Sequence, residues 1–91
     1  MATVRCVITF DIPDGPIGPY DADDGLGQLR RLPGVQQAVL YESREGKPDY
    51  LLDVQADDAS YDGVQKALDR LVGEYSSYLT NVTRRRYRVL A

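Results

Sequence analysis

From Thr3 to Phe10, every second residue is apolar, and the residues between are mostly polar. A period of two is typical of a strand with one face buried and one face open, so residues 3–10 are predicted to form a half-buried strand. The side that would face the core carries Val4, Cys6, Ile8 and Phe10, and the other side carries Arg5, Val7 and Thr9.

The segment from Asp11 to Tyr20 interrupts this pattern. It contains three prolines and two glycines, which disfavour both a helix and the hydrogen-bond ladder of a sheet. The composition predicts a loop of about ten residues, and a loop of that length in a small domain is often functional. We therefore expect it to act as a lid over a binding site.

The rest of the chain divides into two helices and three strands. A short helix carries Leu26, Leu29 and Leu32, begins near Asp21, Asp23 or Asp24, and ends at Pro33-Gly34. Residues 35–42 and 49–55 read as strands joined by a polar turn. A second helix, capped by Asp57 or Asp58, repeats apolar residues at helical spacing: Tyr61, Val64, Leu68, Leu71 and Tyr75. Residues 80–90 form a last strand.

This order of elements, strand, helix, strand, strand, helix, strand, predicts one ferredoxin-like α+β domain that spans residues 1–91. The four-stranded antiparallel sheet would have its strands in the order 4-1-3-2. Right-handed crossovers place both helices on the same face of the sheet. The other face would remain uncovered.

The uncovered face is expected to mix apolar and charged side chains. It would carry Arg5, Val7 and Thr9, then Leu51, Asp53 and Gln55, and then Arg84, Arg86 and Arg88. Such a face is neither a core nor an ordinary solvated surface. Two such sheets can pack against each other, which predicts a homodimeric α+β barrel with a polar pocket inside.

Four of the nine arginines fall between positions 84 and 88, in a chain with a formal net charge of -3. A cationic cluster needs an anionic partner. In one reading, arginines and carboxylates neutralise each other along a subunit seam, with Arg5 opposite Asp53 in neighbouring strands. In the other, the arginines hold an anionic ligand through forked hydrogen bonds.

Composition narrows the function classes. The acidic balance, and the lack of an aromatic pair on the exposed strand positions, argue against a nucleic-acid partner. There is no long apolar run, so we expect no membrane span and a cytoplasmic protein. With no histidine in the chain, the single cysteine, Cys6, lacks the usual partner of a catalytic thiol and is predicted to be a small buried hydrophobe.

Several segments together resemble the dimeric α+β barrel superfamily: Leu32-Pro-Gly-Val35, Gln37-Ala-Val-Leu-Tyr41, Tyr50-Leu-Leu-Asp-Val54 and the opening Arg5-Cys-Val-Ile-Thr-Phe-Asp-Ile-Pro13. That group includes proteins similar to muconolactone isomerase, EthD-like proteins, polyketide cyclases and cofactor-free monooxygenases. The resemblance implies a homodimer that acts on a small molecule. The histidine-based chemistry and haem ligation of some members have no residue here to carry them.

We therefore predict a cofactor-independent isomerase or cyclase that transfers a proton on an anionic conjugated substrate. Asp53 would be the catalytic base, and the substrate would be bound by Arg5, Thr9, Arg86, Arg88 and Tyr87. The alternatives are a non-catalytic module that binds a metabolite or assembles with a partner, and a cofactor-free monooxygenase. No cofactor or metal site is predicted, because the acidic stretch 21–24 lacks the spacing of a calcium loop and suits a helix cap.

Overall fold

The computed structural model describes residues 2–13 and 19–90, apart from the side chains of residues 19–22. Its elements in chain order are β1 (Thr3–Asp11), α1 (Pro19–Arg30), β2 (Val35–Glu42), β3 (Tyr50–Asp57), the 3-10 turn η1 (Asp58–Ser60), α2 (Tyr61–Glu74) and β4 (Thr80–Arg88). The order confirms the arrangement predicted from the sequence.

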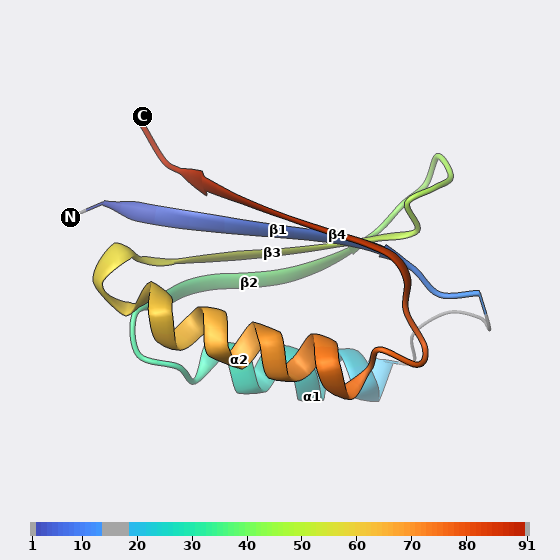
Figure 1. Ribbon diagram of the computed structural model, residues 1–91, viewed down its shortest axis with the longest axis horizontal. Helices are drawn as coiled ribbons and strands as arrows, with labels where there is room; N and C mark the ends of the chain where they lie inside the picture. The colour runs from blue at the N-terminus through green and yellow to red at the C-terminus, as the bar shows by residue number, and fades with distance from the viewer. Residues whose placement is uncertain (1, 14–18, 91) are drawn as a thin grey trace.

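The strands form one antiparallel sheet in the order β2-β3-β1-β4. Both helices lie below the same face of this sheet, which leaves the opposite face without a second layer (Figure 1). The predicted ferredoxin-like fold and strand order are therefore confirmed. We call these two surfaces the covered face and the open face.

The core lies between the covered face and the helices. In β1 it takes Cys6, Ile8 and Phe10, the side that the alternating pattern had assigned to the interior. Phe10 stacks on Tyr50 of β3, with ring centroids 5.6 Å apart. The helices contribute Leu26, Leu29, Tyr61, Val64, Ala67, Leu68 and Leu71. Burial of this apolar surface supplies most of the driving force for folding.

Element boundaries differ from the prediction in the segment after β1. The strand continues to Asp11 and α1 already begins at Pro19, a position where a helix tolerates proline because the first turn needs no N–H partner. The central part of the predicted lid, residues 14–18, lies outside the described residues. The predicted cap of the second helix is also different: Asp57 occupies the N-cap position of η1, but its side chain accepts a hydrogen bond from Gln36 Nε2 at 2.8 Å instead.

Two details of the predicted sheet are wrong. The register expected between the first and third strands is shifted by two residues, because Val7, and not Arg5, lies opposite Asp53. The faces of β4 are also exchanged. Arg84, Arg86 and Arg88 pair with Ile8, Cys6 and Val4 on the covered face, whereas Thr83, Arg85 and Tyr87 pair with Thr9, Val7 and Arg5 on the open face.

The exchange in β4 has a physical cause. β4 is an edge strand, and all of its residues except Arg84 are exposed on whichever face they lie. An arginine can occupy the covered side of such a strand because its side chain still reaches water. The alternating residues of β4 therefore point to two faces that are both exposed to solvent. For this reason the sequence pattern could not show which face is covered by the helices.

Candidate functional site

Side chains on the open face form three rows that cross the sheet. The rows are Tyr41, Leu51, Thr9 and Thr83; Val39, Asp53, Val7 and Arg85; and Gln37, Gln55, Arg5 and Tyr87. Four of the predicted site residues, Arg5, Thr9, Asp53 and Tyr87, therefore share this face. Arg86 and Arg88 do not.

Asp53 is the most deeply buried charged residue of the open face, with 2% of its surface exposed. Val39 and Val7 are its neighbours in the row, and Arg5 reaches diagonally across to bind it. Arg5 Nε donates to Asp53 Oδ1 at 2.8 Å, which confirms the expected ion pair despite the shifted register. The hydrogen bond to this carboxylate, together with its charge, raises the pKa of Arg5.

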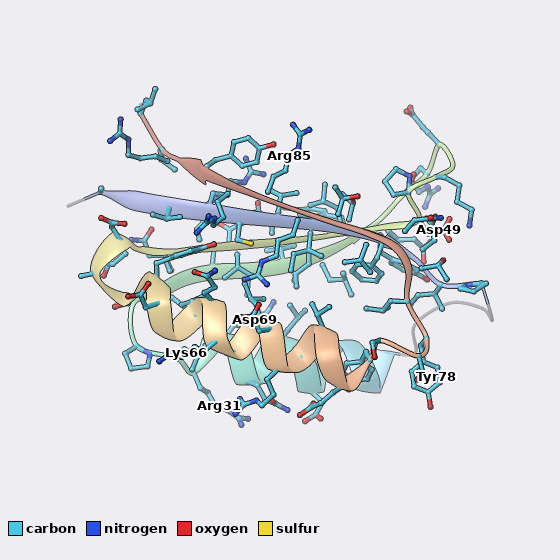
Figure 2. The ribbon with its side chains drawn as sticks, viewed as in Figure 1. Arg31, Asp49, Lys66, Asp69, Tyr78 and Arg85 are labelled. Carbon is cyan, nitrogen blue, oxygen red and sulfur yellow. The ribbon has the colours of Figure 1, made fainter. Side chains whose placement is uncertain are left out.

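Asp53 is only half satisfied by this contact. Within the described part of the chain, Oδ2 accepts no hydrogen bond. Arg85 stands in the same row, on the far side of Val7, and points away from the helices (Figure 2). It too has no ion-pair partner among residues 2–13 and 19–90. Oδ2 is not among the buried atoms left without a partner, so it keeps some contact with solvent and can accept a donor from outside the subunit.

A second polar group lies between the covered face and the start of α2. It consists of Cys6 in β1, Tyr61 in α2, and Arg84 and Arg86 in β4, and we call it the Tyr61 cluster. Tyr61 is the first residue of α2 and 7% exposed, whereas Cys6 is fully buried as a free thiol. The predicted role of Cys6 as a small buried residue is confirmed.

The phenol of Tyr61 is the unusual member of this cluster. Its oxygen is buried, and no described group meets it in regular hydrogen-bond geometry; the Cys6 thiol lies beside it and is the one described side chain close enough to interact as a weak hydrogen-bond partner. Burial, which has the largest effect, and the neighbouring Cys6 thiol together raise the pKa of Tyr61 to about 12, against the opposing charges of Arg84 and Arg86. The group is therefore a protonated donor at neutral pH. Buried polar atoms without a partner are uncommon and call for an explanation.

The two arginines of the cluster differ. Arg84 is anchored to α2, because its Nη1 donates to the Asp69 carboxylate and its Nη2 approaches the Gln65 carbonyl oxygen at 3.5 Å. Arg86 lies opposite Cys6 in the sheet and has no ion-pair partner within the described chain. It is exposed and free to bind an anion. Arg88 lies one row further along the same side, opposite Val4.

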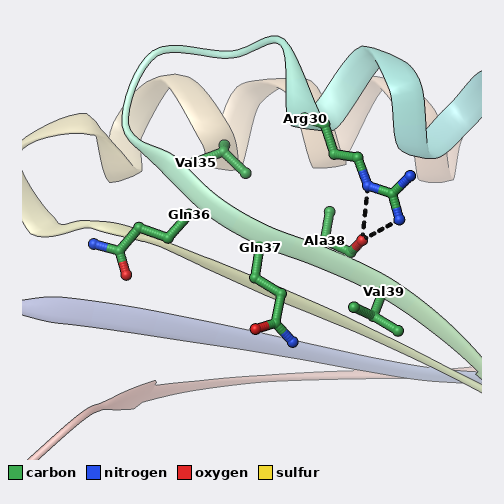
Figure 3. Close-up of a pocket in the computed structure, with 6 residues that line it drawn as sticks. All are labelled: Arg30, Val35, Gln36, Gln37, Ala38 and Val39. Atoms are coloured by element: carbon green, nitrogen blue, oxygen red, sulfur yellow. Dashed lines mark hydrogen bonds between the residues drawn. The ribbon is translucent and has the colours of Figure 1, made fainter.

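A groove of about 280 Å³ runs along the outer edge of β2 (Figure 3). It is lined by Arg30, Val35, Gln36, Gln37, Ala38 and Val39. Arg30 of α1 donates two hydrogen bonds to the Ala38 carbonyl oxygen, from Nη2 at 2.8 Å and from Nε at 3.1 Å. The groove contains neither the Arg5–Asp53 pair nor the Tyr61 cluster. Its one guanidinium is already occupied by the backbone, so we do not assign the site to it.

Sequence reasoning identified the open-face carboxylate but missed the Tyr61 cluster. Tyr61 occupies an apolar position of a helical repeat, where an aromatic residue reads as core. The three alternating arginines were the available signal, but they were assigned to the opposite face. Among the described residues, no cluster of three or more acidic, cysteine or histidine side chains could hold a metal ion. No described helix has the length and apolar character needed to cross a membrane.

No protein-family model matches the sequence, and no curated protein matches it significantly. Solved structures do share its fold. A protein from Mycobacterium tuberculosis, Rv0793, is 18% identical and superposes with a TM-score of 0.76, over 100% of this chain and 97% of that one. A dimeric ferredoxin-like protein of unknown function from Thermobifida fusca is 12% identical, with a TM-score of 0.72 over 97% and 92% of the two chains.

A third similar structure is a DABB family protein with a ferredoxin-like fold from Mesorhizobium loti. It is 14% identical and covers 100% of both chains, with a TM-score of 0.67. The predicted resemblance to dimeric α+β barrel proteins is thus confirmed at the level of fold. Identities this low establish the shared fold alone.

Proposed function

We propose that the protein is a homodimeric enzyme that acts without a cofactor on a small, anionic, conjugated substrate. In this proposal the open faces of two subunits pack together, and each subunit carries its own reaction site at the Tyr61 cluster. The dimeric state described for the Thermobifida fusca structure supports the first part. The second part depends on one observation, the buried and unpartnered phenol of Tyr61 beside two guanidinium groups.

The chemistry follows from the charge of the cluster. A substrate carbonyl that gains negative charge as a neighbouring carbon loses its proton would accept a hydrogen bond from Tyr61 Oη. Arg86 would face the same oxygen, and Arg84 is already fixed on α2 by Asp69. Donors that are in place before the charge develops stabilise an enolate more than they stabilise the neutral substrate. Isomerisation and cyclisation of conjugated substrates both pass through such an anion.

The proton taken from carbon needs an acceptor on the same side of the sheet. Asp53 lies on the open face, so it does not face a substrate bound at the Tyr61 cluster; its predicted role as the base stays a prediction. Asp69 is the carboxylate that contacts the cluster, and its side chain is 62% exposed. We assign to Asp69 the acceptance of the proton and its return to the substrate at a second carbon.

A second candidate is a cofactor-free monooxygenase. It is favoured by a structure from Nitrosomonas europaea, provisionally described as an antibiotic biosynthesis monooxygenase, with 11% identity and a TM-score of 0.69 over 99% and 89% of the two chains. The same carbanion would react with O2, so that a CH2 group becomes a carbonyl and the second oxygen atom leaves as water. Oxygen consumption distinguishes this reaction from an isomerisation.

Binding of salicylate, a small conjugated anion with its own fluorescence, tests the site. We expect Tyr61→Phe and Arg86→Gln each to weaken binding about tenfold, because each removes one donor to a charged oxygen. Tyr78→Phe, at an exposed tyrosine, and Arg70→Gln, at an exposed arginine of α2, are the matched controls. Equal affinity in all four variants, measured by fluorescence titration, would refute the site.

A further inference from the structure

The open face carries two charged groups that are incomplete within one subunit. Asp53 is buried and uses only Oδ1, whereas Arg85 has no ion-pair partner in the described chain. Both belong to the central row of the face, where Val7 of β1 separates them. Because β1 lies between β3 and β4, the two groups stand on opposite sides of one strand.

We infer that a second copy of this chain covers the open face with its twofold axis above β1, so that Asp53 binds Arg85 of the partner subunit. This inference rests on the proposed open-face dimer and specifies its geometry. Two sheets packed face to face lie about 10 Å apart with their strands roughly aligned. With the axis above β1 and parallel to it, β3 of one subunit faces β4 of the other. Each row of side chains then faces the same row of the partner subunit.

The central row then becomes complementary. Val7 meets Val7 of the partner subunit at the axis, and the two Asp53–Arg85 contacts form symmetrically on either side, as a closed twofold interface requires. Arg5 also lies on β1, but its bond to Asp53 directs its guanidinium toward β3 and away from the axis. The free oxygen of each buried carboxylate would gain a guanidinium donor from the other subunit.

Other placements of the axis do not complete these charges. With the axis above β3, Asp53 would face Asp53 of the partner subunit. With the axis above β4, Arg85 would face Arg85 of the partner subunit. An axis along the central row, across the strands, brings both residues against their own copies. Axes midway between neighbouring strands place at least one of the two charges against valine. Like charges and unpaired charges are costly in a desolvated interface.

Cross-linking tests the position of the axis. In a Cys6→Ala background, Thr3→Cys places a thiol on the open side of β1 near the end of the strand, and Gln37→Cys places one on the open side of the outer strand β2. With the axis above β1, the two Thr3→Cys thiols lie across from each other, whereas the β2 positions lie several strands apart. We expect a short bismaleimide to link Thr3→Cys subunits efficiently and to leave Gln37→Cys subunits unlinked.

Charge reversal tests the contact itself. We expect Arg85→Glu to raise the dimer dissociation constant at least tenfold in sedimentation experiments. Arg88→Glu, an equal change on the opposite side of the same strand, should alter it less than twofold. Equal effects of the two variants, or efficient linking of Gln37→Cys alone, would overturn the inference and leave the dimer intact. A wild-type monomer at high concentration would overturn both the inference and the proposed dimer.

Discussion

The two faces of the sheet treat buried polar groups in opposite ways. The open face has no second layer, yet its buried carboxylate, Asp53, has a guanidinium at 2.8 Å. The covered face packs against two helices, yet the phenol of Tyr61 is left without a hydrogen bond among the described residues. Asp53 already has one donor and its second oxygen can take another from a partner subunit, whereas the hydroxyl of Tyr61 has no acceptor in the described part of the chain and could donate to a ligand. This difference supports our proposal that the open face is an interface and the Tyr61 cluster a reaction site.

The largest expected effect comes from truncating one leucine on each face of the sheet. Leu68 is fully buried below the covered face, so we expect Leu68→Ala to lower the unfolding free energy of the subunit by about 2 to 5 kcal/mol. Leu51 is half-buried on the open face. Leu51→Ala should instead weaken association about tenfold, or about 1.4 kcal/mol.

Denaturant titration at several protein concentrations separates these two effects, because the stability of a dimer depends on concentration and that of a monomer does not. If Leu51→Ala lowers subunit stability as much as Leu68→Ala and leaves association unchanged, the open face is not an interface.

At Tyr61 we expect a smaller change in the unfolding free energy, and we expect the substitution to stabilise the protein. Tyr61→Phe removes a buried hydroxyl that has no partner, so it should raise the unfolding free energy by about 1 kcal/mol. Thermal unfolding without ligand measures the change, and Tyr78→Phe should leave the melting temperature unchanged. A gain in stability together with a loss of salicylate binding would mark Tyr61 as a ligand-binding residue. Loss of stability would show that the hydroxyl has a structural role.

The smallest test concerns Asp11, at the end of β1 and away from both sites. Its carboxylate accepts the Asp49 backbone N–H at 2.8 Å and the Asn81 side-chain amide at 2.9 Å. The Asn81 amide, then the backbone N–H, lower the pKa of Asp11 below its ordinary value of 3.8. A lowered pKa means that this contribution to stability is complete above the ordinary value and is lost as the pH falls through the folded value.

We therefore expect Asp11→Asn to destabilise the protein at neutral pH and to differ less from wild type as the pH falls below 3.8. Denaturant unfolding between pH 7 and pH 2 measures this, with the exposed Asp58→Asn as a control. A difference that stays constant over this range would contradict the role of the ionised carboxylate.

Much of the fold could be predicted because most strands have one buried face and one face that is more exposed to solvent. Alternation in β1 identified the buried set of Cys6, Ile8 and Phe10, and helical spacing identified the buried side of α2. The ion pair of Arg5 with Asp53 could be predicted from their shared face. Its register could not, because a shift by two residues leaves every side chain on the same face.

The site was harder to predict for a related reason. Both faces of β4 are wet, so the pattern of its arginines could not distinguish the open face from the covered one. Arg85, for which we propose a contact with the partner subunit, was left out because it falls between the alternating arginines. Tyr61 was missed because a sequence shows that an aromatic residue is buried but does not show whether its hydroxyl has a partner.

The contact between Arg30 and the Ala38 carbonyl oxygen also bears on growth of the sheet beyond one molecule. The outer strand β2 would otherwise offer a free row of backbone groups to any extended chain, which is how edge strands recruit further copies. The Arg30 guanidinium occupies one carbonyl oxygen of this edge, which is then no longer available to a further strand, and it adds a positive charge there. We expect the protein to resist fibre formation from this side and Arg30→Ala to make it more prone to polymerise.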